Sequence, residues 1–124
     1  MLKEQRNAIL SVCKEVRKKL LLKHGGDLAG TCIDASEEIH EKLKVLGIKS
    51  TIIEGWCHYD DASSCSDRDY DEHTWVECEI SGQNIYVDVT ADQFSYFIDE
   101  EIPPIIVGDK PYYMLYDKPV DTEF

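Results

Sequence analysis

The chain has 124 residues, a length that suits one domain and leaves no room for a second hydrophobic core. Its composition, 43% hydrophobic and 31% charged, is that of a globular protein and excludes a disordered or collagen-like chain. Thirteen Lys and Arg against 25 Asp and Glu give a net charge of -12, which repels phosphate backbones and anionic membranes. We therefore expect a single domain over residues 1–124 that binds neither nucleic acid nor membrane.

The cysteines and the start of the chain indicate a compartment. The longest apolar run near the start, Leu20 to Leu22, is far too short for a membrane span or a signal peptide. Five cysteines, at positions 13, 32, 57, 65 and 78, form an odd set without the spacing of a disulfide framework. Both observations favour a cytoplasmic protein with reduced thiols. At least one cysteine then has to be explained by packing or by reactivity.

Two segments of the first half have apolar residues at helical spacing. Ile9, Val16 and Leu20 belong to the first, which predicts an amphipathic helix from residue 2 to residue 23. The second segment predicts a helix from Cys32 to residue 46, with acidic residues toward its start and lysines toward its end. The glycines between the two segments predict a helix cap followed by a loop.

The second half of the chain has the patterns of strands. β-Branched residues predict a strand at 50–56, and apolar residues at every second position predict strands at 73–80 and 85–89. Ser81 and Gly82 supply a two-residue turn, so the last two strands are expected to pair antiparallel. The tail adds one expected edge strand between its prolines. Helices first and strands later predict an α+β fold, with N-terminal helices packed on one face of a small antiparallel sheet.

An acidic segment lies between the first two predicted strands. Residues 57–72 contain six acidic residues and little apolar content, and sixteen residues are more than a simple connection needs. The segment is predicted to be a loop. Two interpretations of it stay open: a solvated excursion, or a flap that favours cationic or neutral substrates over anionic ones.

Cys32 lies at the predicted start of the second helix. Unpaired backbone N–H groups and the positive end of the helix dipole there favour a thiolate over a thiol. The same N–H groups can receive the oxyanion that forms when a thiolate attacks a carbonyl group. Cys13 and Cys78 lie in core-like patterns instead, where a cysteine acts as a small buried hydrophobe. We therefore predict that Cys32 is a nucleophile.

A thiolate nucleophile needs a proton carrier, and the chain has four histidines. His40 is eight residues from Cys32 on the same predicted helix, about 12 Å along its axis. His24 belongs to the connection between the helices, and His58 opens the acidic loop. His73 starts a strand, a rigid element that can hold an imidazole in one place. His73 is thus the predicted general acid/base.

A carboxylate that fixes the tautomer of the imidazole would complete such a site. With a two-residue turn, Ile80 faces Gln83 and Trp75 faces Asp88, so Asp88 and His73 share one face of the sheet as diagonal neighbours. A register slipped by one residue would send Asp88 to the opposite face. The predicted triad of Cys32, His73 and Asp88 therefore depends on an even-length turn.

Three segments also carry a resemblance to a known family: Gly30-Thr31-Cys32, His73-Thr74-Trp75-Val76-Glu77, and the run from Ile85 through Asp88 to Phe94. In this order they resemble the transglutaminase-like branch of the papain-like cysteine fold, over roughly residues 28–94. The tail is similar to that of small bacterial members. The resemblance implies a papain-like core with Cys32 as nucleophile, His73 as general acid/base and Asp88 as the group that orients the imidazole.

The family includes proteases, transglutaminases, glutamine deamidases and amidases. The resemblance thus implies acyl transfer through a thioester on a peptide or protein amide, a glutamine side chain among them, without a cofactor. Papain-type relatives often place a Gln before the cysteine to complete the oxyanion hole, whereas this chain has Asp27 and Leu28 there. The candidates for the second oxyanion donor or for substrate contacts are a backbone N–H, His24, Thr31, Trp75 and Gln93.

Two other interpretations compete with an enzyme of this kind. Cys57, His58, Cys65, His73 and Cys78 offer ligand atoms for zinc. The chain has no Cys-x-x-Cys pair, however, and strand alternation puts His73 and Cys78 on opposite faces, so we expect no metal. The second rival is a catalytically silent acidic protein that recognises a basic partner through the same fold.

Overall fold

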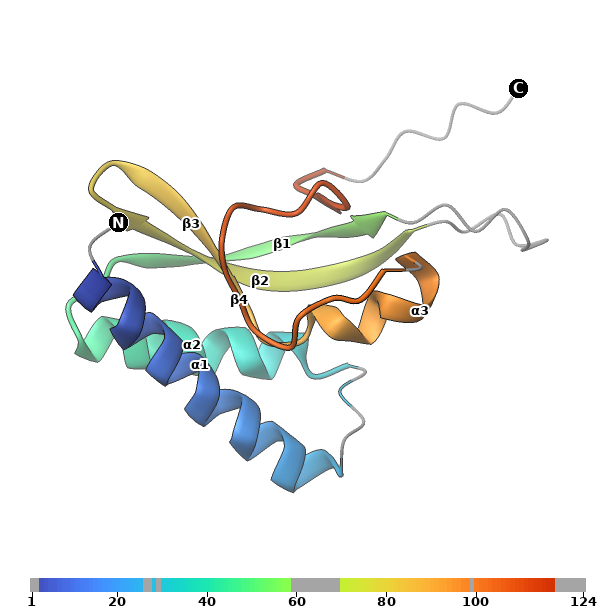
Figure 1. The fold of residues 1–124 in the computed structure, drawn as a ribbon, viewed down its shortest axis with the longest axis horizontal. Helices are drawn as coiled ribbons and strands as arrows, with labels where there is room; N and C mark the ends of the chain where they lie inside the picture. The colour runs from blue at the N-terminus through green and yellow to red at the C-terminus, as the bar shows by residue number, and fades with distance from the viewer. Residues whose placement is uncertain (1–2, 26–27, 29, 59–69, 99, 118–124) are drawn as a thin grey trace.

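The computed structural model describes residues 3–25, 28, 30–58, 70–98 and 100–117. Two long helices come first, α1 (Lys3–His24) and α2 (Cys32–Val45), as Figure 1 shows. The elements that follow are β1 (Ser50–His58), β2 (Tyr70–Ile80), β3 (Gln83–Asp88), the 3-10 helix η1 (Ala91–Phe94), α3 (Ser95–Ile98), β4 (Ile106–Gly108) and β5 (Met114–Leu115).

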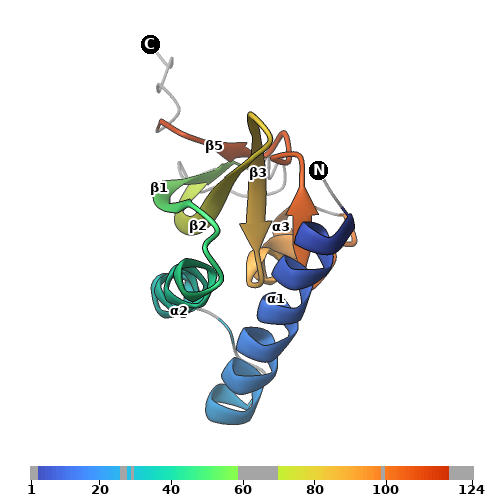
Figure 2. The same ribbon diagram turned by 90° about the vertical axis from the view of Figure 1, so that its left-hand side faces the viewer.

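The strands form one antiparallel sheet in the order β4-β3-β2-β1-β5. Figure 2 shows α1 and α2 side by side beneath this sheet. The predicted α+β class, with both N-terminal helices on one face of a small antiparallel sheet, is therefore confirmed. No helix in the described ranges combines the length and the apolar content needed to cross a membrane.

Both helices follow from their apolar spacing. In α1, Ile9, Val16 and Leu20 are buried along one stripe, and in α2 Ile39 and Leu43 are buried in the same way. The end of α2 has a specific cause. The N–H of Gly47 donates to the carbonyl of Lys44, the N–H of Ile48 donates to that of Leu43, and Gly47 has φ 76°. This pair of hydrogen bonds is the Schellman motif, for which glycine is the favoured residue.

The turn between β2 and β3 has the predicted length. Ser81 has φ 52° and Gly82 has φ 77°, the two left-handed conformations of a type I′ turn, whose twist matches that of the strands. Ile80 pairs with Gln83, and the same register continues to the pair Val76 and Val87. The predicted register of this hairpin is confirmed.

Alternate residues of the strands build two cores on opposite faces of the sheet. We call the first the helix-side core; it is largely aliphatic and consists of Ile9, Val12, Cys13, Val16, Leu20, Leu28, Ala35, Ile39, Leu43, Val76, Cys78, Ile80, Ile85, Val87, Val89 and Val107. We call the second the aromatic core; it consists of Cys57, Trp75, Tyr86, Ala91, Phe94, Ile102, Tyr113 and Met114. His73 packs with the aromatic core, because its ring lies 5.1 Å from that of Phe94 and 6.0 Å from that of Trp75.

Several predicted boundaries are wrong. α2 ends at Val45 and not at residue 46, and β3 spans Gln83–Asp88 and not 85–89. β1 continues through His58 and β2 begins at Tyr70, so the strands extend into both ends of the predicted loop 57–72. His58 pairs with Tyr70, and the rings of Trp56 and Tyr70 meet edge to face at 5.4 Å, which favours pairing over a loop. The acidic residues at 60, 61, 67 and 69 lie outside the described residues. His24 also ends α1 and is not part of the connection.

The tail forms two short strands where one was predicted. β4 pairs with β3, and β5 pairs with β1, so the tail reaches both edges of the sheet. β5 can approach closely because Gly55 on β1 has no side chain. A Cβ at Gly55 would lie 2.5 Å from the carbonyl oxygen of Leu115 and 2.3 Å from the ring of Trp75.

Candidate active site

Cys32 is the first residue of α2 and is partly exposed. Thr31 precedes the helix but makes no side-chain cap; its hydroxyl instead donates to the carbonyl of Leu28 at 2.6 Å. The first N–H groups of α2 therefore have no cap from Thr31, and they lie beside the sulfur of Cys32. The predicted placement of this cysteine at a helix start is confirmed.

His73 and Asp88 come from neighbouring strands and meet inside the protein. Nε2 of His73 lies 2.6 Å from Oδ2 of Asp88, and both side chains are fully buried. The predicted sharing of one face by these two residues is thus confirmed. The ring of Phe94 packs edge to face against the imidazole, which limits the orientations that the imidazole can take.

The carboxylate of Asp88 is held by three further hydrogen bonds. The hydroxyl of Tyr86 donates to Oδ2 at 2.5 Å. The backbone N–H of Thr90 donates to Oδ1 at 2.9 Å, and the hydroxyl of the same residue donates to Oδ1 at 3.3 Å. Burial raises the pKa of Tyr86 well above its ordinary value, so this phenol remains a donor. Both carboxylate oxygens are therefore satisfied before any ligand binds.

The charges of the three groups depend on one another. Burial acts to lower the pKa of His73, but the charge and hydrogen bond of Asp88, with a smaller effect of Cys32, raise it to about 9. Burial acts to raise the pKa of Cys32, but the interaction with His73 and hydrogen bonds from the backbone and side chain of Thr74 leave it below its ordinary value. Burial also opposes the ionised form of Asp88, yet His73, Tyr86 and Thr90 hold its pKa below the usual range.

The second ring nitrogen of His73 faces the interaction with Cys32. Nε2 is occupied by Asp88, and Nδ1 has no formed hydrogen bond to any described residue. The pKa values of Cys32 and His73 shift each other, so the thiol and the imidazole interact although no hydrogen bond joins them in this structure. Such open geometry is common in ligand-free catalytic sites and tightens when substrate binds.

The other described cysteines have the opposite chemistry. Burial raises the pKa of Cys13 and of Cys57 to about 12 and that of Cys78 to about 11. All three are buried thiols without a disulfide. Cys32 is thus the one cysteine within the described ranges whose surroundings favour the thiolate. Cys65 lies outside the described residues.

The further candidates have different places. Trp75 is fully buried, and its indole N–H donates to Glu77 at 2.9 Å, so it fills the aromatic core and does not reach a surface. Thr31 is buried with its hydroxyl bound to Leu28. The side-chain amide of Gln93 donates to the carbonyl of Thr90 at 2.9 Å. Nε2 of His24 is buried without a hydrogen bond to any described residue.

Sequence reasoning missed Thr74, Tyr86, Thr90 and Phe94 as parts of the site. One signal for Tyr86 was present, since it lies two residues before Asp88 and therefore on the same face of β3. Thr74 was hidden because it interacts with Cys32 partly through its backbone. Phe94 belongs to η1, an element that the strand patterns did not predict.

A cleft opens beside His73 and the start of α2. It has a volume of 350 Å³ and is lined by Ile33, Glu54, Gly55, Trp56, Glu72, His73 and Thr74. Ile33 directly follows Cys32, and Thr74 helps to lower the pKa of the Cys32 thiol. A ligand in this cleft would therefore lie against the Cys32 thiol.

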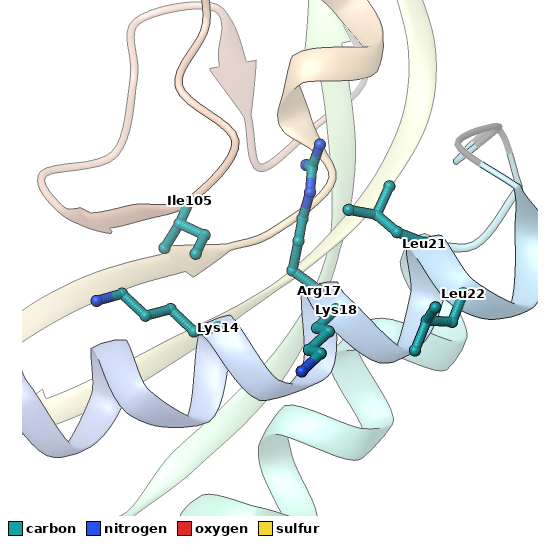
Figure 3. A pocket seen from close by; sticks show the side chains of 6 residues that line it. All are labelled: Lys14, Arg17, Lys18, Leu21, Leu22 and Ile105. Carbon is teal, nitrogen blue, oxygen red and sulfur yellow. The ribbon is translucent and has the colours of Figure 1, made fainter.

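A larger hollow of 430 Å³ lies between α1 and the segment at Ile105, and Figure 3 shows the side chains that line it. Its lining consists of Lys14, Arg17, Lys18, Leu21, Leu22 and Ile105. Lys14 and Lys18 are exposed, and among the described residues no His, Cys, Asp or Glu lines the hollow beside them to activate an amine. Arg17 reaches from this hollow toward η1, where it donates to both carboxylate oxygens of Asp92 at 2.7 Å. Despite its size, we therefore assign this hollow no chemistry.

No three or more His, Cys, Asp or Glu side chains are grouped to hold a metal ion in the part of the chain that the structure describes. Comparisons of the chain with known protein families, with curated proteins and with solved structures give no match.

Proposed function

We propose that the protein is a cysteine enzyme that transfers the acyl group of a peptide or protein amide through a thioester on Cys32, in the manner of the papain-like, transglutaminase-like family. The observation that supports this most directly is the buried 2.6 Å contact between His73 and Asp88 beside a thiol of lowered pKa. The order of the three groups is also suitable, because in this proposal the imidazole lies between the carboxylate and the thiol.

In this proposal the thiolate of Cys32 attacks the carbonyl carbon of the amide and a C–S bond forms. The carbonyl oxygen takes up the negative charge near the uncapped N–H groups of α2. The C–N bond then breaks, and Nδ1 of His73 gives its proton to the departing amine. The neutral imidazole next takes a proton from water as the water attacks the thioester. The C–S bond breaks, and the acid product leaves.

The arrangement of the carboxylate suits this exchange of protons. Asp88 keeps Nε2 of His73 protonated and so presents Nδ1 to the sulfur in either charge state of the ring. Because the pKa of His73 is raised to about 9, the ring carries the proton that the leaving amine needs at neutral pH. The uncapped start of α2 supplies the first oxyanion donor, and the N–H of Cys32 itself is our candidate.

Thiol alkylation tests the proposal. At about pH 6, iodoacetamide should label the native protein at Cys32, and Cys32→Ala should abolish this labelling because thiolates and not thiols react. Cys13→Ala, Cys57→Ala, Cys65→Ala and Cys78→Ala are the controls and should label like the native protein. Ammonia release from glutamine peptides and cleavage of peptide amides then identify the reaction.

Equal labelling of the Cys32→Ala and native proteins would overturn the proposal. A Cys32 thiol no more reactive than a free cysteine would also overturn it and leave a binding protein, since a binder has no need of a depressed thiol pKa.

A further inference from the structure

The cleft beside Cys32 is lined by two negatively charged side chains, Glu54 and Glu72. Glu54 on β1 pairs with Thr74 on β2, and Trp56 pairs with Glu72, so the two carboxylates are diagonal neighbours on one face of the sheet. Diagonal neighbours lie about 7–8 Å apart between backbones. Both glutamates are exposed and line the cleft. Neither side-chain carboxylate has a hydrogen bond or an ion pair to another described residue. Like charges at this spacing repel each other, and a cation between them would relieve the repulsion.

The rest of the cleft is suited to a long side chain that ends in a planar cation. Trp56 supplies an aromatic surface at the cleft, where a guanidinium group can stack. Gly55 lines the cleft between Glu54 and Trp56 and adds no side chain to it. The volume of 350 Å³ is near the lower end of ligand pockets, which span about 300–1,000 Å³, and so suits one side chain better than a large ligand.

The position of the cleft connects this charge to the chemistry. His73 lines it, is fully buried, and has an Nδ1 without a hydrogen bond to any described residue. Thr74 lines it as well, and Ile33, the residue after Cys32, lines its other side. A group bound between Glu54 and Glu72 therefore lies within a residue or two of the amide that Cys32 would attack.

We propose that this cleft is a specificity subsite for an arginine side chain of the peptide substrate, bound by Glu54 and Glu72 and stacked on Trp56. The inference rests on the proposed function, because it names the substrate that the Cys32 site would select. Arginine is preferred to lysine because its planar guanidinium can bond two carboxylates and stack on an indole at once.

Binding to the Cys32→Ala protein tests the subsite without turnover. A blocked peptide that contains arginine is titrated and followed by NMR at the indole N–H of Trp56, against the same peptide with citrulline, which is neutral and nearly isosteric. The arginine peptide should bind about tenfold tighter or more, as expected for ion pairs that are partly sheltered from water. The double variant Glu54→Gln/Glu72→Gln should remove this preference.

The matched control is Glu79→Gln/Glu101→Gln, which has the same net charge as the double variant but changes exposed glutamates away from the cleft. It should keep the preference within about twofold, because charges at a distance are screened by salt. Equal affinity for the arginine and citrulline peptides would overturn the subsite. So would a preference that both double variants lose equally, since this would reflect net charge alone.

A second measurement separates this inference from the proposed function. Cationic and anionic methanethiosulfonates of matched size are reacted with Cys32 in the native protein and in both double variants. The cationic reagent should react faster, and Glu54→Gln/Glu72→Gln should lower the rate ratio about tenfold. A reactive Cys32 without this charge preference would overturn the subsite alone, whereas an unreactive Cys32 would overturn the proposed function.

Discussion

The two cores on opposite faces of the sheet are built by alternate residues of the same strands, yet they hold different kinds of groups. In the helix-side core, Val76 and Val87 face aliphatic side chains, and the thiol of Cys78 has a pKa of about 11. On the aromatic side, His73 and Asp88 are ionised although both are buried. Burial alone therefore suppresses the charge of a group, whereas a buried partner of opposite charge at hydrogen-bond distance maintains it.

The two faces of the sheet are also expected to contribute differently to stability and to the chemistry of the site. The helix-side core has apolar area and few polar groups, so we expect it to carry most of the free energy of folding. On the aromatic side, part of the buried volume is occupied by a hydrogen-bonded network from Tyr86 through Asp88 to His73. Substitutions on the two faces should therefore separate stability from thiol chemistry.

The largest expected effect is on activity and comes from Asp88→Asn. The amide keeps the shape but cannot stabilise the imidazolium, so hydrolysis of an amide substrate should fall about 10²–10⁴-fold. Steady-state rates at neutral pH measure this fall. Asp109→Asn, at an exposed position, is the control and should be active. A fully active Asp88→Asn protein would remove Asp88 from the mechanism.

Leu43→Ala tests the helix-side core. Leu43 is fully buried, and its truncation should lower the free energy of unfolding by about 2–5 kcal/mol. Val45 on the same helix is 86% exposed, so Val45→Ala should change stability by less than about 0.5 kcal/mol. Urea denaturation gives both values. The alkylation rate of Cys32 under strongly native conditions should be unchanged. A large fall in this rate would contradict the expectation that the two faces separate stability from thiol chemistry.

Arg17→Met tests the ion pair that joins α1 to Asp92 in η1. The guanidinium group donates to both oxygens of Asp92 and to the carbonyl of Val89, and its side chain is 15% exposed. Hydrogen bonds to charged groups of this kind contribute about 1.5–3 kcal/mol, which thermal or urea unfolding should detect. Lys19→Met breaks an ion pair with Glu38 in which the lysine is 67% exposed and should cost less than about 1 kcal/mol. Similar losses in the two variants would contradict this ranking.

The pH dependence of stability isolates the charge on His73. In Cys32→Ala the thiol no longer titrates, and the raised pKa of His73 means that the folded state keeps a proton that the unfolded state loses. The contribution of protonated His73 to the free energy of unfolding is complete below pH 6.5 and is lost as pH rises through the pKa that His73 has in the folded state. We expect a loss of about 1–2 kcal/mol between pH 6 and pH 8, measured by urea denaturation below the pH range in which the buried thiols of Cys13, Cys57 and Cys78 would add a loss of their own.

The native protein and a double variant are the controls for this pH series. The lowered pKa of Cys32 acts in the opposite direction, because its contribution to stability grows as pH rises toward the ordinary thiol value. The native protein should therefore lose less stability over this interval than Cys32→Ala. Cys32→Ala/Asp88→Asn should show almost no slope from His73, and an undiminished slope there would mean that another group titrates.

The smallest expected effect is at the turn. Ser81 adopts φ 52°, a conformation that asparagine accepts more easily than serine. Ser81→Asn should raise the free energy of unfolding by about 0.5 kcal/mol without any effect on thiol reactivity. Ser50→Asn on β1 is the control and should not stabilise the protein, since asparagine is disfavoured in strands.

Local signals predicted the parts of the fold that local interactions decide. The helix α2 could be predicted because its spacing, charges and Gly47 agree, and the hairpin because Ser81 and Gly82 fix its register. The pairing of His73 with Asp88 followed from that register. The extension of β2 to Tyr70 and the short strands of the tail could not be predicted, because ring packing on Trp56 and the close approach of Leu115 to Gly55 are tertiary effects.

The same limit applies to the candidate site. The thiol, the imidazole and the carboxylate could be chosen from residue type and position, since each role needs specific chemistry. The contact of Thr74 with Cys32 and the cleft between Glu54 and Glu72 depend on how β1, β2 and α2 are docked, which one sequence does not encode in any short pattern.

The sulfur and the imidazole belong to elements that form separately. His73 and Asp88 lie 15 residues apart in one hairpin, whereas Cys32 reaches them only when α2 docks on the sheet. Before docking, the cysteine of the growing chain has the acidity of any free cysteine and stays protonated at neutral pH. The Cys32 thiol of an undocked chain is therefore less reactive toward alkylators than that of the folded protein, in which α2 packs on the sheet.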